Sequence, residues 1–86
     1  MDRKQATELA RVIFGEMGTI SSQETFADGT PMEKLVWKIG EFGRSVGRGK
    51  TWETAMRNAL KKLIARPGHK PEELVRLKAL LTEVPS

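Results

Sequence analysis

Hydrophobic side chains recur at helical spacing along most of the chain, with polar side chains between them. Over residues 3–17 they fall three and four positions apart, as expected for an amphipathic helix with one buried face. Asp2 stands at the N-cap position, Gln5 follows three residues later, and Gly18 can end the helix. We therefore predict a first helix over 3–17.

A second helix is predicted from Thr30 to Val46. Its start has an N-cap Thr30, a proline at the first helical position and Glu33 at the third. The hydrophobic side chains that follow converge on one stripe: Met32, Leu35, Val36, Ile39, Phe42 and Val46. Residues 19–30 interrupt the pattern and contain the turn signal Asp28-Gly29, which predicts one longer loop.

Three glycines, Gly40, Gly43 and Gly47, lie on one flank of this predicted helix. Each interior glycine costs a helix about 0.8 to 1 kcal/mol relative to alanine, so their presence needs a reason. Close approach of a neighbouring helix backbone is the favoured interpretation, and a hinge or kink is the alternative.

Two further helices are predicted over residues 51–65 and 71–83. Thr51 caps the first, Arg66-Pro67-Gly68 ends it, and Pro71 with two acidic residues begins the second. No segment shows the alternation typical of a strand. We therefore expect an all-α fold, a small bundle of about four helices in a single domain over 1–86.

Composition limits how the chain can be stabilised and where in the cell it is expected. The chain has 86 residues and no cysteine, so hydrophobic packing must stabilise it without disulfides or thiolate metal sites. No segment approaches the roughly 20 apolar residues that a membrane span needs, and no apolar run follows the charged N-terminus. A cytoplasmic location is the expectation.

The net charge of +4 is unevenly distributed. Residues 44–70 contain eight Lys and Arg residues against the single acid Glu53, whereas the segments on either side are slightly acidic. An exposed helix face usually mixes charges of both signs, because like charges one turn apart repel. This basic segment therefore suits a polyanion, although an ordinary solvated surface would look similar.

The third predicted helix carries most of this charge on its outward face. Arg, Lys, Asn and Thr are also the side chains that contact phosphates and base edges in nucleic acids. The candidate nucleic-acid-binding residues are Arg44, Arg48, Lys50, Thr54, Arg57, Asn58, Lys61, Lys62 and Arg66.

The segment Gly47-Arg48-Gly49-Lys50-Thr51 resembles part of a phosphate-binding loop, but its spacing is wrong. The motif needs a glycine five residues before Gly49, where Arg44 stands, and it needs a preceding strand. Nucleotide hydrolysis is therefore not predicted. Free backbone N–H groups at the start of the third helix could still hold one anion, or the link could simply be flexible.

Trp37 lies about 160° from the apolar stripe of the second predicted helix, among charged residues. Either another segment folds over it, or it is an exposed anchor for a protein partner. His69 is the one histidine and has no clustered partner for metal binding or catalysis. We expect a non-enzymatic protein without a cofactor.

Two functions follow from these residues. The first is a small nucleic-acid-associated protein, with regulation as one option for its role, that presents the basic helix to a phosphate backbone. The second is a protein-interaction module, either a homo-oligomer or a small adaptor or inhibitor, that uses Trp37. The sequence does not distinguish DNA from RNA.

Overall fold

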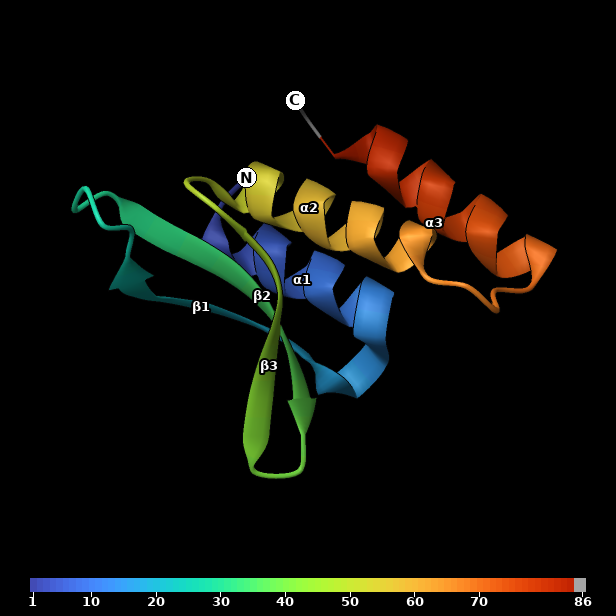
Figure 1. The fold of residues 1–86 in the computed structure, drawn as a ribbon, viewed down its shortest axis with the longest axis horizontal. Coiled ribbons are helices and arrows are strands. Elements are labelled where there is room, and N and C mark those ends of the chain that lie inside the picture. Colours follow the sequence, from blue (N-terminus) through green and yellow to red (C-terminus); the bar gives the residue numbers. More distant parts are fainter. Residues whose placement is uncertain (85–86) are drawn as a thin grey trace.

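The computed structural model describes residues 1–84 and contains both helices and a sheet (Figure 1). In chain order the elements are α1 (Arg3–Phe14), the short 3₁₀ helix η1 (Gly15–Met17), β1 (Gly18–Thr25), β2 (Pro31–Ile39), β3 (Phe42–Gly49), α2 (Trp52–Ala65) and α3 (Pro71–Glu83). The strands form an antiparallel sheet in the order β1-β2-β3. The expected all-α bundle is therefore wrong, and the fold is a mixed one.

Helix α1 begins as the sequence predicts. The Asp2 carboxylate accepts a hydrogen bond from the Gln5 backbone N–H at 2.8 Å, and the Gln5 side chain accepts one from the Asp2 N–H at 3.0 Å. This reciprocal pair satisfies two of the N–H groups that a helix start leaves open. The α-helix ends at Phe14, and η1 occupies the last three residues of the predicted helix.

The predicted helix over 30–46 is a β-hairpin instead. Gly40 has φ +61°, which glycine adopts without strain, and it forms a two-residue turn with Glu41 that pairs Ile39 with Phe42. Hydrophobic residues at 35, 39, 42 and 46 fit a helix and a hairpin equally well. The turn at Gly40 decides between them, because it folds the segment back on itself.

Strand β1 lies in the segment predicted as a loop and pairs with β2. The turn between them is where Asp28-Gly29 indicated it. There the Asp28 carboxylate accepts hydrogen bonds from the Thr30 N–H at 3.0 Å and from the Thr30 hydroxyl at 2.7 Å. The turn signal was read correctly, whereas the weakly apolar strand before it was missed.

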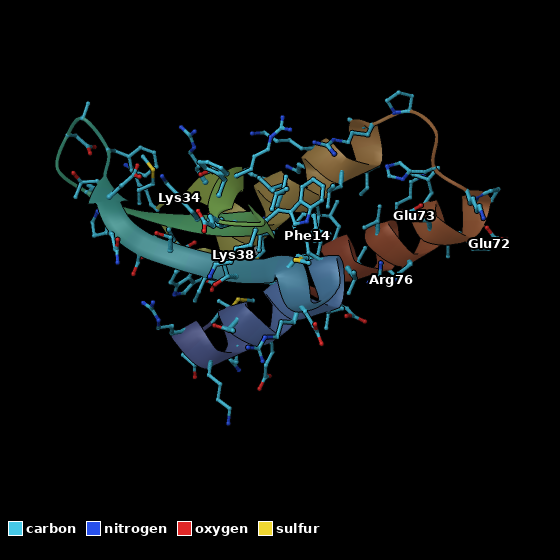
Figure 2. The ribbon with its side chains drawn as sticks, turned by 90° about the horizontal axis from the view of Figure 1, so that it is seen from below. Phe14, Lys34, Lys38, Glu72, Glu73 and Arg76 are labelled. Carbon is cyan, nitrogen blue, oxygen red and sulfur yellow. The ribbon has the colours of Figure 1, made fainter. Side chains whose placement is uncertain are left out.

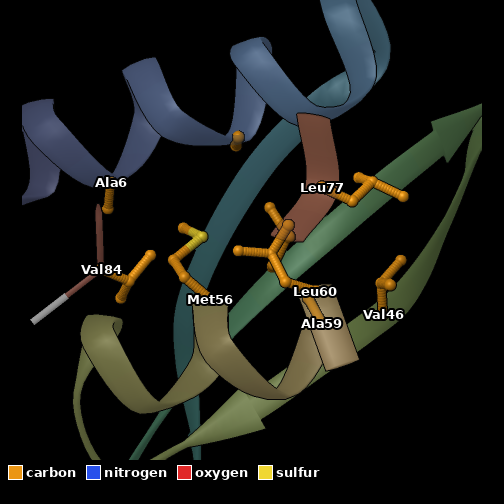
Figure 3. Close-up of a cluster of buried hydrophobic side chains, with 9 residues drawn as sticks. Ala6, Val46, Met56, Ala59, Leu60, Leu77 and Val84 are labelled. Atoms are coloured by element: carbon orange, nitrogen blue, oxygen red, sulfur yellow. The ribbon is translucent and has the colours of Figure 1, made fainter. Parts of the chain in front are cut away.

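Helices α1 and α2 contact the strands, and α3 packs against α2 at the outer side of this layer (Figure 1). The hydrophobic core lies between the helices and the sheet, and Met56 and Leu60 of α2 are completely buried at its centre (Figure 3). The other buried members are Ala6, Ala10, Leu35, Val46, Ala59, Leu77 and Val84. Helices α2 and α3 follow the predicted ranges closely.

Strand β3 and helix α2 approach each other at Gly47. A Cβ atom at this position would lie 2.2 Å from the Ala55 carbonyl oxygen and 2.6 Å from the Ala59 nitrogen. Close backbone approach is thus the right explanation for Gly47, although the residue lies on a strand. Among the helices that the structure describes, none is long and apolar enough to cross a membrane.

Candidate nucleic-acid interface

Helix α2 lies alongside β3, and every fourth residue of the helix faces that strand. Thr54 meets β3 at Gly49, where its Cβ would be 2.7 Å from a Cβ added to the glycine. One turn later, the Asn58 side-chain amide donates a hydrogen bond of 2.7 Å to the Arg48 carbonyl oxygen. These two candidate residues therefore hold the helix against the strand.

The same row continues to Lys62 and Arg66, which meet Arg44 of β3. Together with Ser45, Val46 and Leu63, these three basic residues line a small hollow of about 80 Å³. We call Arg44, Lys62 and Arg66 the basic hollow. Its volume exceeds the roughly 10 to 15 Å³ that one water molecule needs on the same measure.

Strand pairing explains why Arg44 lies beside residues of α2. Arg44 pairs across the sheet with Trp37, whose ring packs on the core, so both side chains project from the face that carries the helices. Lys62 and Arg66 lie one helical turn apart in the last part of α2 and at its end. The three residues thus come from both ends of the basic segment and line one hollow.

No carboxylate of residues 1–84 lines the basic hollow. Among residues 1–84, no ion pair within 4.0 Å involves any of its three members. The negative end of the α2 dipole offsets part of the repulsion between them, since basic side chains are favourable near a helix C-terminus. The hollow thus combines three basic residues with the C-terminal end of α2.

Arg48 and Lys50 lie in a different setting. Arg48 pairs with Lys34 in the sheet, on the face that no helix covers, and Lys34 is bound to Glu24 at 2.6 Å. Lys34 lowers the pKa of Glu24 through this hydrogen bond and its charge, and Arg48 adds a smaller attraction. Figure 2 shows Lys34 and Lys38 on the strand, on the other side of the molecule from Glu72 and Glu73 of α3.

Lys50 lies 3.8 Å from Asp28, whose pKa is lowered mainly by its hydrogen bonds to Thr30 and slightly by Lys50. The basic charge at this end of the segment is therefore partly neutralised. The start of α2 already holds a carboxylate as well, because Glu53 forms an ion pair of 3.0 Å with the Met1 amine. These contacts weaken the case for a separate anion site at the start of α2.

Arg57 and Lys61 precede Asn58 and Lys62 by one residue, so they lie about 100° further around the helix. Lys61 is exposed and Arg57 is half-buried. They form a second row beside the basic hollow without lining it. The nine candidate residues thus divide into a hollow, a helix–strand contact, a partly neutralised pair and this outer row.

Trp37 belongs to the core. Its ring is half-buried and stacks on Phe14 of α1, with the centroids 5.9 Å apart and the planes 9° from parallel. Figure 2 shows Phe14 where the end of α1 meets the sheet. The helix that was to present Trp37 to a partner does not exist, and another segment covers the ring.

The most exposed aromatic side chain of the described residues is Phe42, of which 80% is accessible, and sequence reasoning missed it. It was assigned to the buried stripe of the predicted helix. Reading Gly40-Glu41 as a hairpin turn would have placed Ile39 and Phe42 at a tip instead.

His69 connects α2 with α3. One ring nitrogen contacts the Leu63 carbonyl oxygen, and the other lies 3.5 Å from the Glu73 carboxylate. The side chain is thus occupied by structural contacts. No cluster of His, Asp and Glu side chains that could hold a metal ion occurs in residues 1–84.

Comparison with known proteins gives no relative: no protein family, curated protein or solved structure matches the chain. The function is therefore argued from the surface of the molecule.

Proposed function

We propose that the protein binds nucleic acid through the basic hollow and the neighbouring Lys61. The observation that carries the proposal is the convergence of Arg44, Lys62 and Arg66 on one hollow that no carboxylate of the described residues lines. Arginine binds phosphate through a planar fork and lysine binds it as a point charge. A phosphodiester placed there would relieve the repulsion among the three side chains.

The outer row extends this surface along the helix. Helix α2 has 14 residues, which corresponds to about 21 Å at 1.5 Å per residue. A duplex with that length along its axis carries roughly six phosphates on each strand, at 3.4 Å per base step. Arg57 and Lys61 precede the hollow along α2, so they can contact phosphates on that side of the one in the hollow.

Salt dependence of binding tests this proposal. A labelled duplex of DNA, one of RNA and a single strand are titrated with the protein, and fluorescence anisotropy gives the affinity. Contacts from about four basic residues predict a slope of log affinity against log salt between about −3 and −4 for duplex DNA. A fourfold rise in salt then weakens binding by roughly two decades.

Matched variants locate the site. Arg44→Ala and Lys62→Ala should each flatten the slope by about one unit. Lys78→Ala, an exposed position on α3, removes the same charge and should leave the slope unchanged. If all three variants weaken binding equally, the attraction is the diffuse charge of a basic protein. If the wild type binds none of the three ligands at low salt, the proposal is wrong.

The alternative of a protein-interaction module centred on Trp37 loses its main support, because that ring is stacked on Phe14. We further propose that the protein has no catalytic activity of its own and acts in the cytoplasm. Both statements rest on the sequence, which offers no nucleophile paired with a base and no cysteine.

A further inference from the structure

The β2–β3 hairpin ends in two exposed hydrophobic side chains. Ile39 and Phe42 are paired partners across the turn, and 52% of the first and 80% of the second are accessible. We call this pair the hairpin tip. Figure 1 shows the turn of the hairpin projecting beyond the helices. Burying the Phe42 side chain in a complex is favourable, and the free protein does not gain this stabilisation.

The hairpin tip adjoins the basic hollow. Phe42 and Arg44 are two positions apart on β3, so both side chains leave the same face of the strand, about 7 Å apart along it. An aromatic ring is therefore placed beside a cluster of phosphate-binding side chains. Glu41 in the turn disfavours an anion beyond the tip, which leaves the Arg44 side for a phosphate.

This combination selects among the possible occupants of the tip. A second copy of the chain seated on the tip would bring two basic hollows close together, and their like charges would repel. An unpaired nucleotide fits both features, because its base can stack on an aromatic ring while its phosphate binds Arg and Lys.

We propose that Phe42 stacks on an unpaired base whose phosphate lies in the basic hollow, with Ile39 supporting the ring. The ligand class is nucleic acid that offers an unpaired base, either a single strand or a duplex with an overhang. The inference rests on the proposed function and narrows it from any phosphate backbone to these ligands.

The test compares a blunt duplex with the same duplex carrying a single-stranded overhang. Wild type should bind the overhang duplex about fivefold or more tightly than the blunt one, since stacking one base on an aromatic ring contributes at least about that factor. Phe42→Ala should abolish this preference and leave blunt-duplex affinity unchanged, whereas Phe42→Trp should retain it. Val75→Ala removes another exposed hydrophobic side chain, 69% accessible, from α3 and should change neither affinity.

Fluorescence of 2-aminopurine in the overhang gives a second reading. Stacking on Phe42 should change its emission with wild type and not with Phe42→Ala. If wild type binds both duplexes equally, or Phe42→Ala keeps the preference, the inference fails while the proposed function stands. If neither duplex nor a single strand binds at low salt, both fail. A dimer in sedimentation that Phe42→Ala abolishes would instead assign the tip to self-association and overturn the inference.

Discussion

Replacing Gly47 with alanine tests the contact on which the basic hollow depends. The added methyl carbon would lie 2.2 Å from the Ala55 carbonyl oxygen and 2.6 Å from the Ala59 nitrogen, both backbone atoms of α2. Neither can move without the helix, so β3 and α2 must separate. Overpacking of this kind costs about 1 to 3 kcal/mol, and backbone contacts place Gly47→Ala at the upper end of that range.

The size of this effect is measurable in a small domain. A chain of this length has about 4 to 13 kcal/mol of net stability. A loss of 2 to 3 kcal/mol would lower the melting temperature by roughly 10 °C or more. Urea unfolding followed by circular dichroism gives the free energy, and anisotropy gives the affinity for nucleic acid. Binding should fall beyond the loss explained by unfolded protein, because Lys62 and Arg66 move away from Arg44.

Gly40→Ala is the matched control for Gly47→Ala. A Cβ atom at Gly40 would meet nothing within 4 Å, but the residue has φ +61°. Its cost is therefore backbone strain alone, about 1 to 2 kcal/mol, and the basic hollow should stay intact. If Gly47→Ala unfolds with the wild-type free energy within about 0.5 kcal/mol, the contact between β3 and α2 is looser than the structure indicates and the reasoning fails.

Two further substitutions test the hydrophobic core and the turn between β1 and β2. Trp37→Ala should lower the free energy of unfolding by about 2 to 3 kcal/mol in urea titrations, less than a fully buried ring would lose; unchanged stability would mean that the stack on Phe14 contributes nothing. The hydrogen bonds from Thr30 lower the pKa of Asp28 in the folded protein below its ordinary value of 3.8. The ionised Asp28 therefore stabilises the fold above pH 3.8, and this stabilisation is lost as the pH falls through the pKa of the folded state. Asp28→Asn should therefore remove part of the acid destabilisation seen in thermal melts down to about pH 3, and an identical acid profile in both proteins would contradict this.

The sequence predicted elements whose signals are local. The cap at Asp2, the cap at Thr51 and the proline at Pro71 identify the starts of the three helices correctly. The hairpin was missed because Thr30-Pro31-Met32-Glu33 imitates a helix start and the hydrophobic spacing that follows suits both structures. The glycines within the predicted helix were the sequence feature that could have revealed the hairpin. Gly40 forms its turn, and Gly47 lets the backbone of α2 approach β3 closely.

The candidate site was predicted in composition but not in arrangement. The basic segment identified Arg44, Lys62 and Arg66, yet only the hairpin and the packing of α2 bring them around one hollow. Helical geometry placed Thr54 and Asn58 with the exposed bases, although both contact β3. Their role depends on a neighbouring strand that the sequence did not reveal. Trp37 was assigned to the wrong face for the same reason. A side chain at this position points away from the apolar stripe of a helix, but on the strand it points toward the core.

The hydrogen bond from Asn58 to the Arg48 carbonyl also affects the outer edge of the sheet. Strand β3 is an outer strand, and outer strands expose backbone groups that can pair with a strand of another molecule. Asn58 occupies one of these acceptors from the side of the helix. A second chain that extended the sheet past Arg48 would compete with this bond and meet α2 beside the strand. The side chain that resembled a contact for nucleic acid thus covers part of the strand edge, which disfavours edge-to-edge pairing there.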